Sequence, residues 1–498
     1  MKFSIKTITA EKVEADLLIF LVWEGKLKDI FVDLGVKLPS VVKEAAEREE
    51  FKGKVGDSLV LYTKGLIGSY KLLILGLGKE DEFDLYQLRK SIAISIKKAM
   101  QIKAVRVALV PTESWFKQFD VTAIGQAIVE GASLGGYQFF KYKGLEEKER
   151  QVLIEHILIL AKPNKVGFLE KGVNIGNIFS QATIYARDLV NEPAAVTTPS
   201  YLALEAVSIA KSGNGSIKVK IYDKEEVEKM GMNSYLGVAK GSDEPPKFIV
   251  LTYRGGKPKG KIIVIGKGIT FDTGGLSLKP PEHMETMKLD MAGGAAVLGI
   301  FKALVALKPT LEVVGIIAAC ENMPSGSSLR PGDILKALNG KTIEVLNTDA
   351  EGRLTLADSL SYAVKLKPDA IIDMATLTGA CMVALGQEIA GLWGNESKLI
   401  EKVKKAADLV GEKVWPMPLE KEYKELIKSH IADVKNIQTG RYGGAITAAL
   451  FLEEFVEDRP WVHLDIAGPA YEEKDTYLVP QGGSGFGVRT VLQFLLNY

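Results

Sequence analysis

Three stretches of this 498-residue chain combine acidic side chains with glycines, and all three lie in its second half. They are KGITFDTGGLSLKP, which follows the apolar run KIIVIG and contains Asp272, then MKLDMAGGAAV with Asp290, and NTDAEGRLTLADS with Asp349 and Glu351. Functional residues of α/β proteins gather at the carboxyl ends of strands. If the third stretch begins extended, a period of two places Asp349, Glu351 and Arg353 on one face. The spacing therefore predicts that these carboxylates converge on one point.

The charges in these stretches favour a metal centre. Three basic residues, Lys267, Lys279 and Arg353, are interleaved with the four carboxylates. Taken singly, each acidic residue is more simply explained as a turn or helix cap, and each lysine as a solvated charge. Four carboxylates buried together without a counter-charge would be very costly, however. Two divalent metal ions about 3.5–4 Å apart would supply that charge.

Cysteine and histidine can contribute little to such a centre. The chain has only two cysteines and four histidines, which are widely separated in sequence. A cysteine-rich zinc site and a pair of histidines on one helical turn are therefore excluded. The metal ligands must be mostly carboxylates, which suits Mg²⁺, Mn²⁺ or a carboxylate-bound Zn²⁺.

Composition indicates an ordinary globular protein. Hydrophobic residues make up 47% of the chain and charged residues 25%. The formal net charge is +1, whereas nucleic-acid-binding proteins usually carry a basic excess, so nucleic acid is not the expected partner. The low cysteine content fits a reducing compartment. No signal peptide or membrane span is recognisable in the sequence, so we expect a cytoplasmic protein with no membrane partner.

Apolar runs alternate with helical periodicity along the whole chain, which predicts the α/β class. In the first third, the predicted strands are Leu17–Val22, Lys71–Leu77, Val105–Val110 and Ile157–Leu160, and the predicted helices are Leu85–Met100 and Val121–Leu134. Further on, the predicted strands are Phe248–Tyr253, Lys261–Gly266, Leu311–Ala319, Ala370–Met374 and Trp461–Ile466, and the predicted helices are Met291–Leu307, Thr355–Leu366 and Leu399–Gly411. We expect an N-terminal α/β domain over residues 1–170, a connecting helix over 171–190 and a larger catalytic domain over 191–498.

The chain resembles the leucine (cytosol) aminopeptidase family. NTDAEGRL at Asn347–Leu354 matches the family's signature octapeptide, which is highly specific. Similar blocks occur in the expected order: DLVNEPA, GKGITFDTGGLSLKP, MKLDMAGGAAV, ATLTGA and GGAITAALFL. The resemblance extends from Tyr185 to the C-terminus. It implies a macro-like N-terminal α/β domain and a larger catalytic domain with a mixed central sheet and flanking helices.

The resemblance also implies roles for seven residues. Two divalent ions, Mn²⁺ or Zn²⁺, would be bound by Lys267, Asp272, Asp290, Asp349 and Glu351. Lys267 would ligate as a neutral amine, while Lys279 stays charged and polarises the scissile carbonyl. Arg353 would hold a bicarbonate ion that accepts a proton from the attacking water.

Substrate and assembly follow from the same resemblance. The substrates would be peptides with a free N-terminus, whose amino group binds a metal and Asp290. The side-chain pocket, which would favour leucine-like residues, matches Met287, Thr376, Gly379 and Ala467. The family assembles as a hexamer, so a homohexamer is expected.

Other functions have weaker support. GASLG fits the G-x-S-x-G pattern of serine hydrolases around Ser133, but its surroundings are helical in period, whereas that motif requires a strand before the serine. No nucleotide-binding motif is present. A two-metal phosphoesterase could use the same carboxylates, although nothing favours phosphate over peptide. Some relatives bind DNA as regulators, and this remains the alternative function.

Overall fold

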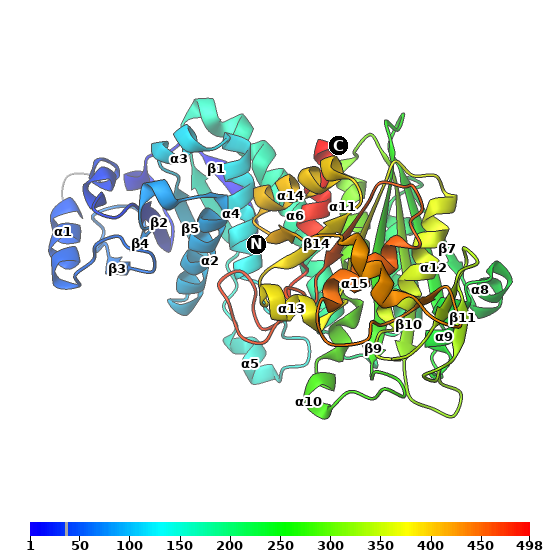
Figure 1. Cartoon of the computed structure of the whole chain (residues 1–498). Helices are drawn as coiled ribbons and strands as arrows, with labels where there is room; N and C mark the ends of the chain where they lie inside the picture. Colours follow the sequence, from blue (N-terminus) through cyan, green and yellow to red (C-terminus); the bar gives the residue numbers. More distant parts are fainter. Residues whose placement is uncertain (35–37) are drawn as a thin grey trace. The chain divides into compact units, whose positions relative to one another are not determined.

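The chain folds into two compact units in a computed structural model, which describes residues 1–34 and 38–498. The first unit comprises residues 1–180 together with 475–480, and the second comprises residues 181–474 and 481–498. Figure 1 shows that each unit contains a sheet with helices packed against it. The predicted α/β class is confirmed. Helix α6 (Val166–Asn191) connects the two units in sequence.

The first unit is built on a six-stranded sheet. Its strand order is β1 (Lys2–Lys6), β6 (His156–Leu160), β5 (Arg106–Val110), β2 (Leu17–Val22), β4 (Lys71–Gly76) and β3 (Ser58–Tyr62). Only β3 runs antiparallel to its neighbour. All six residues of β2 are buried, as expected for a central strand covered on both faces. Leu17, Ile19 and Leu21 join one hydrophobic cluster, while Leu18 and Phe20 join the other.

Helices cover both faces of this sheet. Residues of α2 (Leu85–Gln101) and α4 (Val121–Gly135) belong to one cluster, and residues of α1 (Leu38–Arg48) belong to the other. Asp84 and Asp120 cap α2 and α4 through the backbone amides of Gln87 and Ala123. The remaining helical segments are α3 (Glu113–Gln118), α5 (Leu145–Arg150), η1 (Ala10–Lys12), η2 (Leu27–Asp33), η3 (Glu80–Glu82) and η4 (Pro163–Lys165).

The helical assignment of GASLG is confirmed. Ser133 lies inside α4 and is 7% exposed. Its neighbours Gly131 and Gly135 face α2, where an added Cβ would come within 2.5 Å of the Arg89 carbonyl oxygen and 2.4 Å of the Ala93 Cβ, respectively. The small residues therefore allow close helix packing, and no strand precedes the serine as a nucleophile elbow requires.

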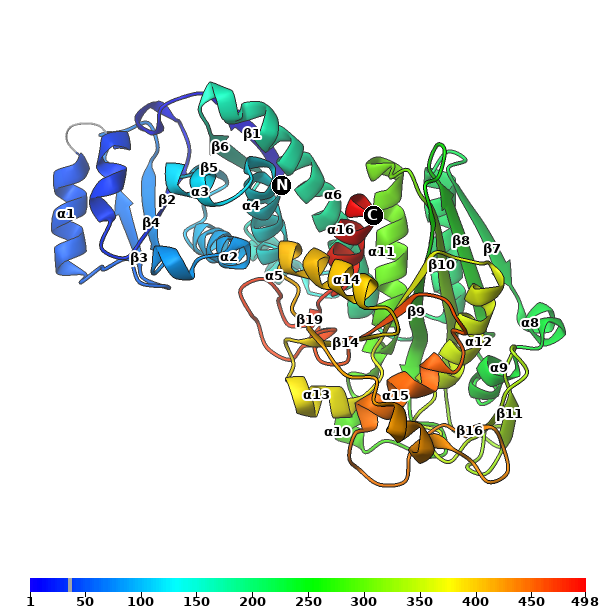
Figure 2. The same ribbon diagram turned by 45° about the horizontal axis from the view of Figure 1, so that its top comes forward.

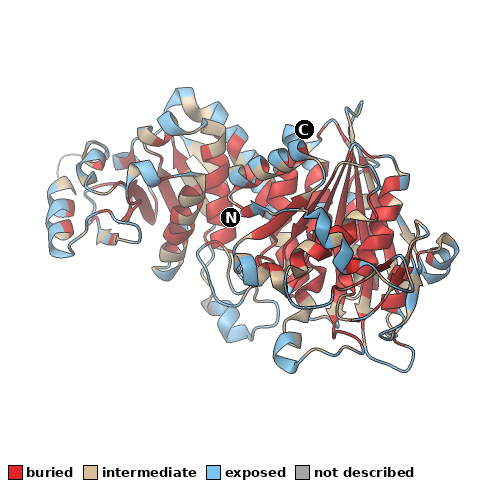
Figure 3. Cartoon of the chain, viewed as in Figure 1, coloured by how far each residue is buried: buried red, intermediate tan, exposed pale blue. Residues whose placement is uncertain are grey.

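The second unit has a larger mixed sheet of eight strands. Its order is β15 (Val414–Pro416), β14 (Ala390–Gly394), β17 (Trp461–Asp465), β13 (Ala370–Ala375), β9 (Lys261–Asp272), β10 (Glu312–Asn322), β8 (Lys247–Arg254) and β7 (Ile217–Tyr222). The four central strands, β17, β13, β9 and β10, are mutually parallel. Figure 3 shows that they are buried almost throughout. Their carboxyl ends therefore meet at one edge.

Helices on both faces bury this second sheet (Figure 2). One face carries α9 (Asn233–Ala239), α12 (Gly352–Lys365) and α15 (Gly444–Glu453), and the other carries α7 (Pro199–Ser212), α11 (Ala292–Leu307) and α16 (Val488–Asn497). The remaining elements are α8 (Lys224–Met230), α10 (Pro281–Met284), η5 (Met287–Met291), β11 (Ile334–Lys336), β12 (Thr342–Glu344), α13 (Gly379–Leu385), α14 (Ser397–Val410), η6 (Lys421–Ile427), β16 (Val434–Lys435), β18 (Tyr471–Glu472) and β19 (Gly482–Gly483).

One segment of this unit is apolar enough to be compared with a membrane span. Pro281–Leu307 has a mean hydropathy of 1.6 over its most apolar window, but 83% of that window is buried inside the structure. The segment includes α11, whose residues pack against β9 and β10. Its hydrophobicity is that of a core helix.

Close backbone contacts fix the start of α11 against the sheet. A Cβ added to Gly266 of β9 would lie 2.2 Å from the Gly293 carbonyl oxygen, and one added to Gly293 would lie 2.1 Å from the Met374 carbonyl oxygen. These distances leave no room for a side chain, and backbone cannot rotate away as a side chain can. Glycine at both positions thus sets the spacing of β9, β13 and α11.

We predict that Gly266→Ala destabilises the protein, because its methyl group must push α11 away from β9. The expected loss in free energy of unfolding is about 1–3 kcal/mol, the usual range for overpacking. Denaturant unfolding monitored by circular dichroism measures it. Gly326→Ala is the matched control, since no atom lies within 4 Å of the added Cβ. Equal stability of the two variants would contradict this account of the contact.

Candidate metal centre

Three buried carboxylates meet at the carboxyl end of β9. Asp272 is the last residue of that strand, Asp290 lies in η5, and Glu351 directly precedes α12. One carboxylate oxygen from each lies within 4.8 Å of the others. Each residue is at most 3% exposed. Segments separated by up to 79 positions thus deliver three negative charges to one desolvated point.

Lys267 lies among these carboxylates. Its Nζ is 2.8 Å from both Asp290 Oδ1 and Glu351 Oε1, and it donates a hydrogen bond to the Thr376 carbonyl oxygen at 2.9 Å. Burial lowers the pKa of this lysine, but the adjacent carboxylates outweigh burial and raise the pKa above its ordinary value. Gly352 makes room for the lysine, since a Cβ there would lie 2.5 Å from the lysine Cε.

A second lysine bridges the outer carboxylates. Lys279 Nζ lies 2.9 Å from Asp272 Oδ2 and 2.5 Å from Asp349 Oδ1. Burial opposes its charge, yet Asp272 and Glu351 raise its pKa above the ordinary value. Burial also raises the pKa of Asp349, and the negative charge of Asp272 acts in the same direction. The two lysines therefore serve as counter-ions for the four carboxylates.

The two lysines do not fully balance the negative charge of the four carboxylates. Burial raises the pKa of Glu351 to about 8, with Asp272 adding to the shift and Lys267 opposing it. Burial likewise raises the pKa of Asp290 to about 6. Asp290 Oδ2 and Glu351 Oε2 are buried and have no hydrogen-bond partner among the described residues. Such oxygens are hard ligands suited to Mg²⁺, Mn²⁺ or Zn²⁺, so the donor set fits divalent metal ions.

A lysine ligand is compatible with this environment. An amine that ligates a metal must be neutral, whereas Lys267 is held charged by Asp290 and Glu351. Cations bound to those carboxylates would remove this support for the ammonium form. Burial, the largest influence on this group, would then favour the neutral amine.

Two details of the sequence prediction need correction. Lys267 and Asp272 lie within a strand, because β9 continues to Asp272 instead of ending at Gly266. Residues 347–353 are not extended. The Asn347 carbonyl oxygen accepts a hydrogen bond from the Ala350 amide, and the Asn347 side chain accepts one from the Asp349 amide. This turn leads directly into α12 at Gly352, so the three charges do not share one strand face.

Arg353 lies in the first turn of α12 and faces the chain near Asn436. Its Nη1 donates to the Asn436 carbonyl oxygen at 2.8 Å, while its Nε has no partner among the described residues. Burial lowers the pKa of Arg353 to about 10, and the negative charges of Glu351 and Asp465 oppose this shift. The guanidinium therefore keeps an unused donor.

Several supporting residues escaped the sequence analysis. Asn436 is fully buried, and its side chain accepts a hydrogen bond from the Leu346 amide and donates to the carbonyl oxygens of Asn347 and Ala350. Asn322 donates to both Asp272 Oδ1 and the Thr348 carbonyl oxygen. Single asparagines carry no recognisable pattern. The one signal in the sequence is that Asn322 ends a strand and Asn436 directly follows one.

The four residues predicted to form the side-chain pocket lie close to one of two acidic residues, Asp290 or Asp465. Thr376 donates to Asp290 Oδ1 at 2.6 Å, and Met287 belongs to the same 3₁₀ helix as Asp290. Asp465 accepts hydrogen bonds from the Leu377 and Ala467 amides and from the Thr378 hydroxyl, which caps α13 just before Gly379. Thr376 is buried, Met287 and Ala467 are half-buried, and Gly379 is exposed.

We predict that Asn436→Ala weakens binding of Mn²⁺ to the intact chain, because the turn that carries Asp349 and Glu351 loses three of its hydrogen bonds. Loss of such a supporting residue lowers metal affinity about 10–100-fold, which isothermal titration calorimetry measures. Asn339→Ala removes an asparagine that holds a different turn and serves as control. Unchanged Mn²⁺ affinity in a folded Asn436→Ala protein would refute this role.

Comparison with known proteins identifies the family. The model for the cytosol aminopeptidase family, catalytic domain, matches residues 184–492, and the model for its N-terminal domain matches residues 24–144. A protein of Persephonella marina named "Probable cytosol aminopeptidase" is 49% identical over 477 residues, 95% of this chain and 95% of that protein. One of Aquifex aeolicus with the same name is 48% identical over 481 residues, 96% and 94% of the two chains.

Solved structures agree with the sequence matches. A mutant of tomato leucine aminopeptidase has a TM-score of 0.90 and 36% identity, covering 100% of this chain and 97% of that one. The bottromycin maturation enzyme BotP in complex with Mn has a TM-score of 0.85 and 33% identity, covering 97% and 99%. Both the conserved architecture and the sequence identity extend over the full length. This chain therefore belongs to the cytosol aminopeptidase family.

Proposed function

We propose that the constellation at the end of β9 is the catalytic centre of this chain. As a member of the family, the chain is a metal-dependent aminopeptidase. The observation that carries the assignment is the meeting of Asp272, Asp290 and Glu351 around Lys267, with all four buried. Such a concentration of desolvated charge has no structural purpose that an apolar core would not serve better.

Two divalent ions would be held by five residues. Lys267, Asp272, Asp290 and Glu351 would bind one ion, and Asp272, Asp349 and Glu351 would bind the other. When bound, the pair supplies a water molecule of lowered pKa near neutral pH and positive charge close to the scissile carbonyl. Manganese and zinc both suit this donor set, and Mn is the metal named for the related enzyme BotP.

Asp290 and the chain around it would select a free amino terminus. Its Oδ1 is fixed by the Thr376 hydroxyl, which leaves the unpartnered Oδ2 to accept a hydrogen bond from the substrate amine. An acylated amine loses its charge and keeps a single N–H donor, so it cannot replace this contact with a carboxylate and a metal. Met287, Thr376, Gly379 and Ala467 would surround the first side chain, with a preference for leucine and residues of similar size.

Lys279 and Arg353 would act on the reacting groups. Lys279 stays protonated and stabilises the negative charge that develops on the carbonyl oxygen. The free Nε of Arg353 would hold a bicarbonate ion, which would supply a base for the attacking water. We further propose that the enzyme is cytoplasmic and forms a homohexamer, in keeping with the family resemblance.

A metal add-back assay tests the function. Metal-stripped protein is assayed with leucine p-nitroanilide and with N-acetyl-leucine p-nitroanilide after addition of Mn²⁺, Zn²⁺, Co²⁺ or Mg²⁺. We expect metal-restored hydrolysis of the free amine only, and no hydrolysis by folded Asp349→Ala or Glu351→Ala protein. Equal cleavage of the acetylated substrate, or full activity of either variant, would overturn the assignment.

We also predict that Lys279→Ala lowers kcat about 10²–10³-fold while KM changes much less, because its charge acts mainly on the developing oxyanion. Steady-state kinetics with leucine p-nitroanilide separates the two constants. Lys336→Ala removes an exposed lysine of β11 and should leave both constants unchanged. A variant with normal kcat and only a raised KM would contradict this role of Lys279.

A further inference from the structure

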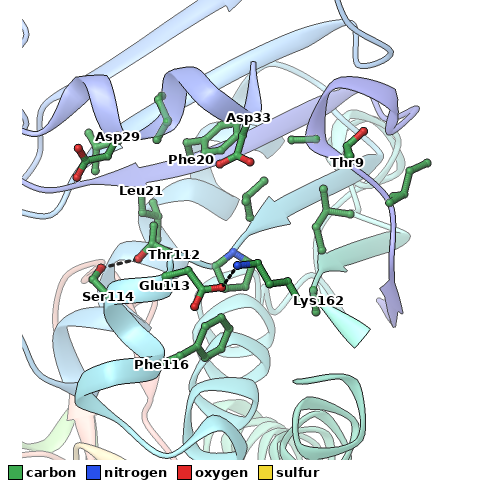
Figure 4. Close-up of a pocket in the computed structure, with 18 of the residues that line it drawn as sticks. Thr9, Phe20, Leu21, Asp29, Asp33, Thr112, Glu113, Ser114, Phe116 and Lys162 are labelled. Atoms are coloured by element: carbon green, nitrogen blue, oxygen red, sulfur yellow. Dashed lines mark hydrogen bonds and ion pairs between the residues drawn. The ribbon is translucent and has the colours of Figure 1, made fainter. Parts of the chain in front are cut away.

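The first unit has a cavity of its own, with a volume of about 650 Å³. It lies at the carboxyl ends of four parallel strands, β1, β6, β5 and β2. Figure 4 shows its lining side chains. They come mainly from the segments 7–10, 20–23, 110–114 and 160–163, which end or follow these strands. The volume lies within the range of small-molecule sites in proteins.

The order of the strands favours ligand binding at this edge of the sheet. After β2 the chain turns to one side of the sheet, where β4 and β3 lie, whereas β5 and β6 lie on the other side of β2. The order of strands therefore reverses next to β2, and the loops that follow β2 and β5 separate there. Open α/β sheets bind their ligands in the crevice at such a switch point.

The floor and one wall of the cavity are apolar. Phe20, Val22 and Ile30 are at most 3% exposed and form part of its lining, and the ring of Phe116 lies on the opposite side. An apolar floor disfavours ligands that have charged groups but no apolar part, because those groups would lose their contact with water. It favours a ligand with an aromatic or branched aliphatic body.

The polar lining is unbalanced in favour of negative charge. Asp29 and Asp33 are exposed, and their carboxylates form no hydrogen bond or ion pair among the described residues, although Lys26 and Lys162 attract them from a distance. Each lysine of the lining forms its ion pair with another carboxylate, Lys162 with Glu113 at 2.8 Å and Lys26 with Glu80 at 2.5 Å. Partial burial in the cavity raises the pKa of Asp33, and Lys162 opposes the shift. In Figure 4 the Asp33 carboxylate points into the cavity, across from the Lys162–Glu113 pair.

We propose that this cavity binds a small organic cation, whose apolar body contacts Phe20 and Phe116 and whose protonated amine is held by Asp33, with Asp29 on the same wall. The ammonium supplies the positive charge that the lining lacks. Phosphate-bearing ligands do not fit this lining, since each lysine already has a carboxylate partner and the two remaining carboxylates repel anions. The site shares no residue with the metal centre.

Three ligands with the same phenyl body test the proposal by isothermal titration calorimetry on the full-length, metal-loaded protein. They are phenethylamine, the neutral 2-phenylethanol and the anionic phenylacetate. We expect the amine to bind about tenfold more tightly than the alcohol, the effect of a charged hydrogen bond, and phenylacetate to bind most weakly. Tighter binding of phenylacetate than of the amine would overturn the proposal.

Variants locate the binding. Asp33→Asn should abolish the roughly tenfold preference for the amine, and Asp29→Asn should reduce it, whereas Glu170→Gln, which removes an exposed carboxylate of α6, should leave it unchanged. Hydrolysis of leucine p-nitroanilide should be unaffected in all three. Amine binding that persists in Asp33→Asn but disappears in Asp349→Asn would place the amine at the metal centre and refute this site. A chain that binds the amine but hydrolyses nothing would refute only the proposed function.

L-phenylalanine adds a carboxylate to the same phenyl body and amine. We expect it to bind more weakly than phenethylamine, because Lys162 and Lys26 already pair with Glu113 and Glu80. Binding of L-phenylalanine that is tighter than that of phenethylamine and that persists in Asp33→Asn would contradict the proposal.

Discussion

The buried negative charge at the end of β9 is the constraint on which the second unit depends. Asp272, Asp290 and Glu351 cannot be placed in a dry interior without compensation, and the chain compensates with Lys267 and Lys279. The raised pKa values of Glu351 and Asp290 indicate that two ammonium groups are not enough. This deficit makes the donor set suitable for cations, and it accounts for the presence of two lysines among the carboxylates.

Such a centre requires the backbone segments that carry its residues to lie unusually close to one another. Gly266 and Gly293 bring the start of α11 against β9 and β13, which sets the position of Asp290 just before that helix. Gly352 removes the side chain that would otherwise occupy the space of Lys267. The asparagines complete the arrangement by holding irregular backbone. Asn436 secures the turn before α12, and Asn322 joins Asp272 to Thr348. The glycines and amides are thus as necessary to the charge arrangement as the charged residues.

Sequence patterns predict some of these features well and others hardly at all. Leu17–Val22 is uniformly apolar, and the structure has a strand with the same bounds, because a strand buried on both faces needs no polar residue. The end of β9 could not be predicted, since its polar residues belong to the cluster of carboxylates and lysines and interrupt the apolar run that normally defines a strand. The geometry of residues 347–353 also differs from the expectation, because the Asn347 side chain accepts a hydrogen bond from the Asp349 amide and the Asn436 side chain donates to the backbone of the turn. Asn436 lies 85 positions from Glu351, and no local pattern connects them.

The same strand-edge geometry has two different outcomes in this chain. At the edge of the second sheet, glycines and charged residues pack closely, and oxygens of three carboxylates lie within 4.8 Å of one another. At the edge of the first sheet, larger side chains such as Phe20 and Phe116 line an open cavity that can take an organic molecule. A carboxylate with a raised pKa lies at each edge, the buried Glu351 in one and the exposed Asp33 in the other. On the two proposals made above, the space around the carboxylate, more than its charge, decides whether the counter-ion is a metal or an amine.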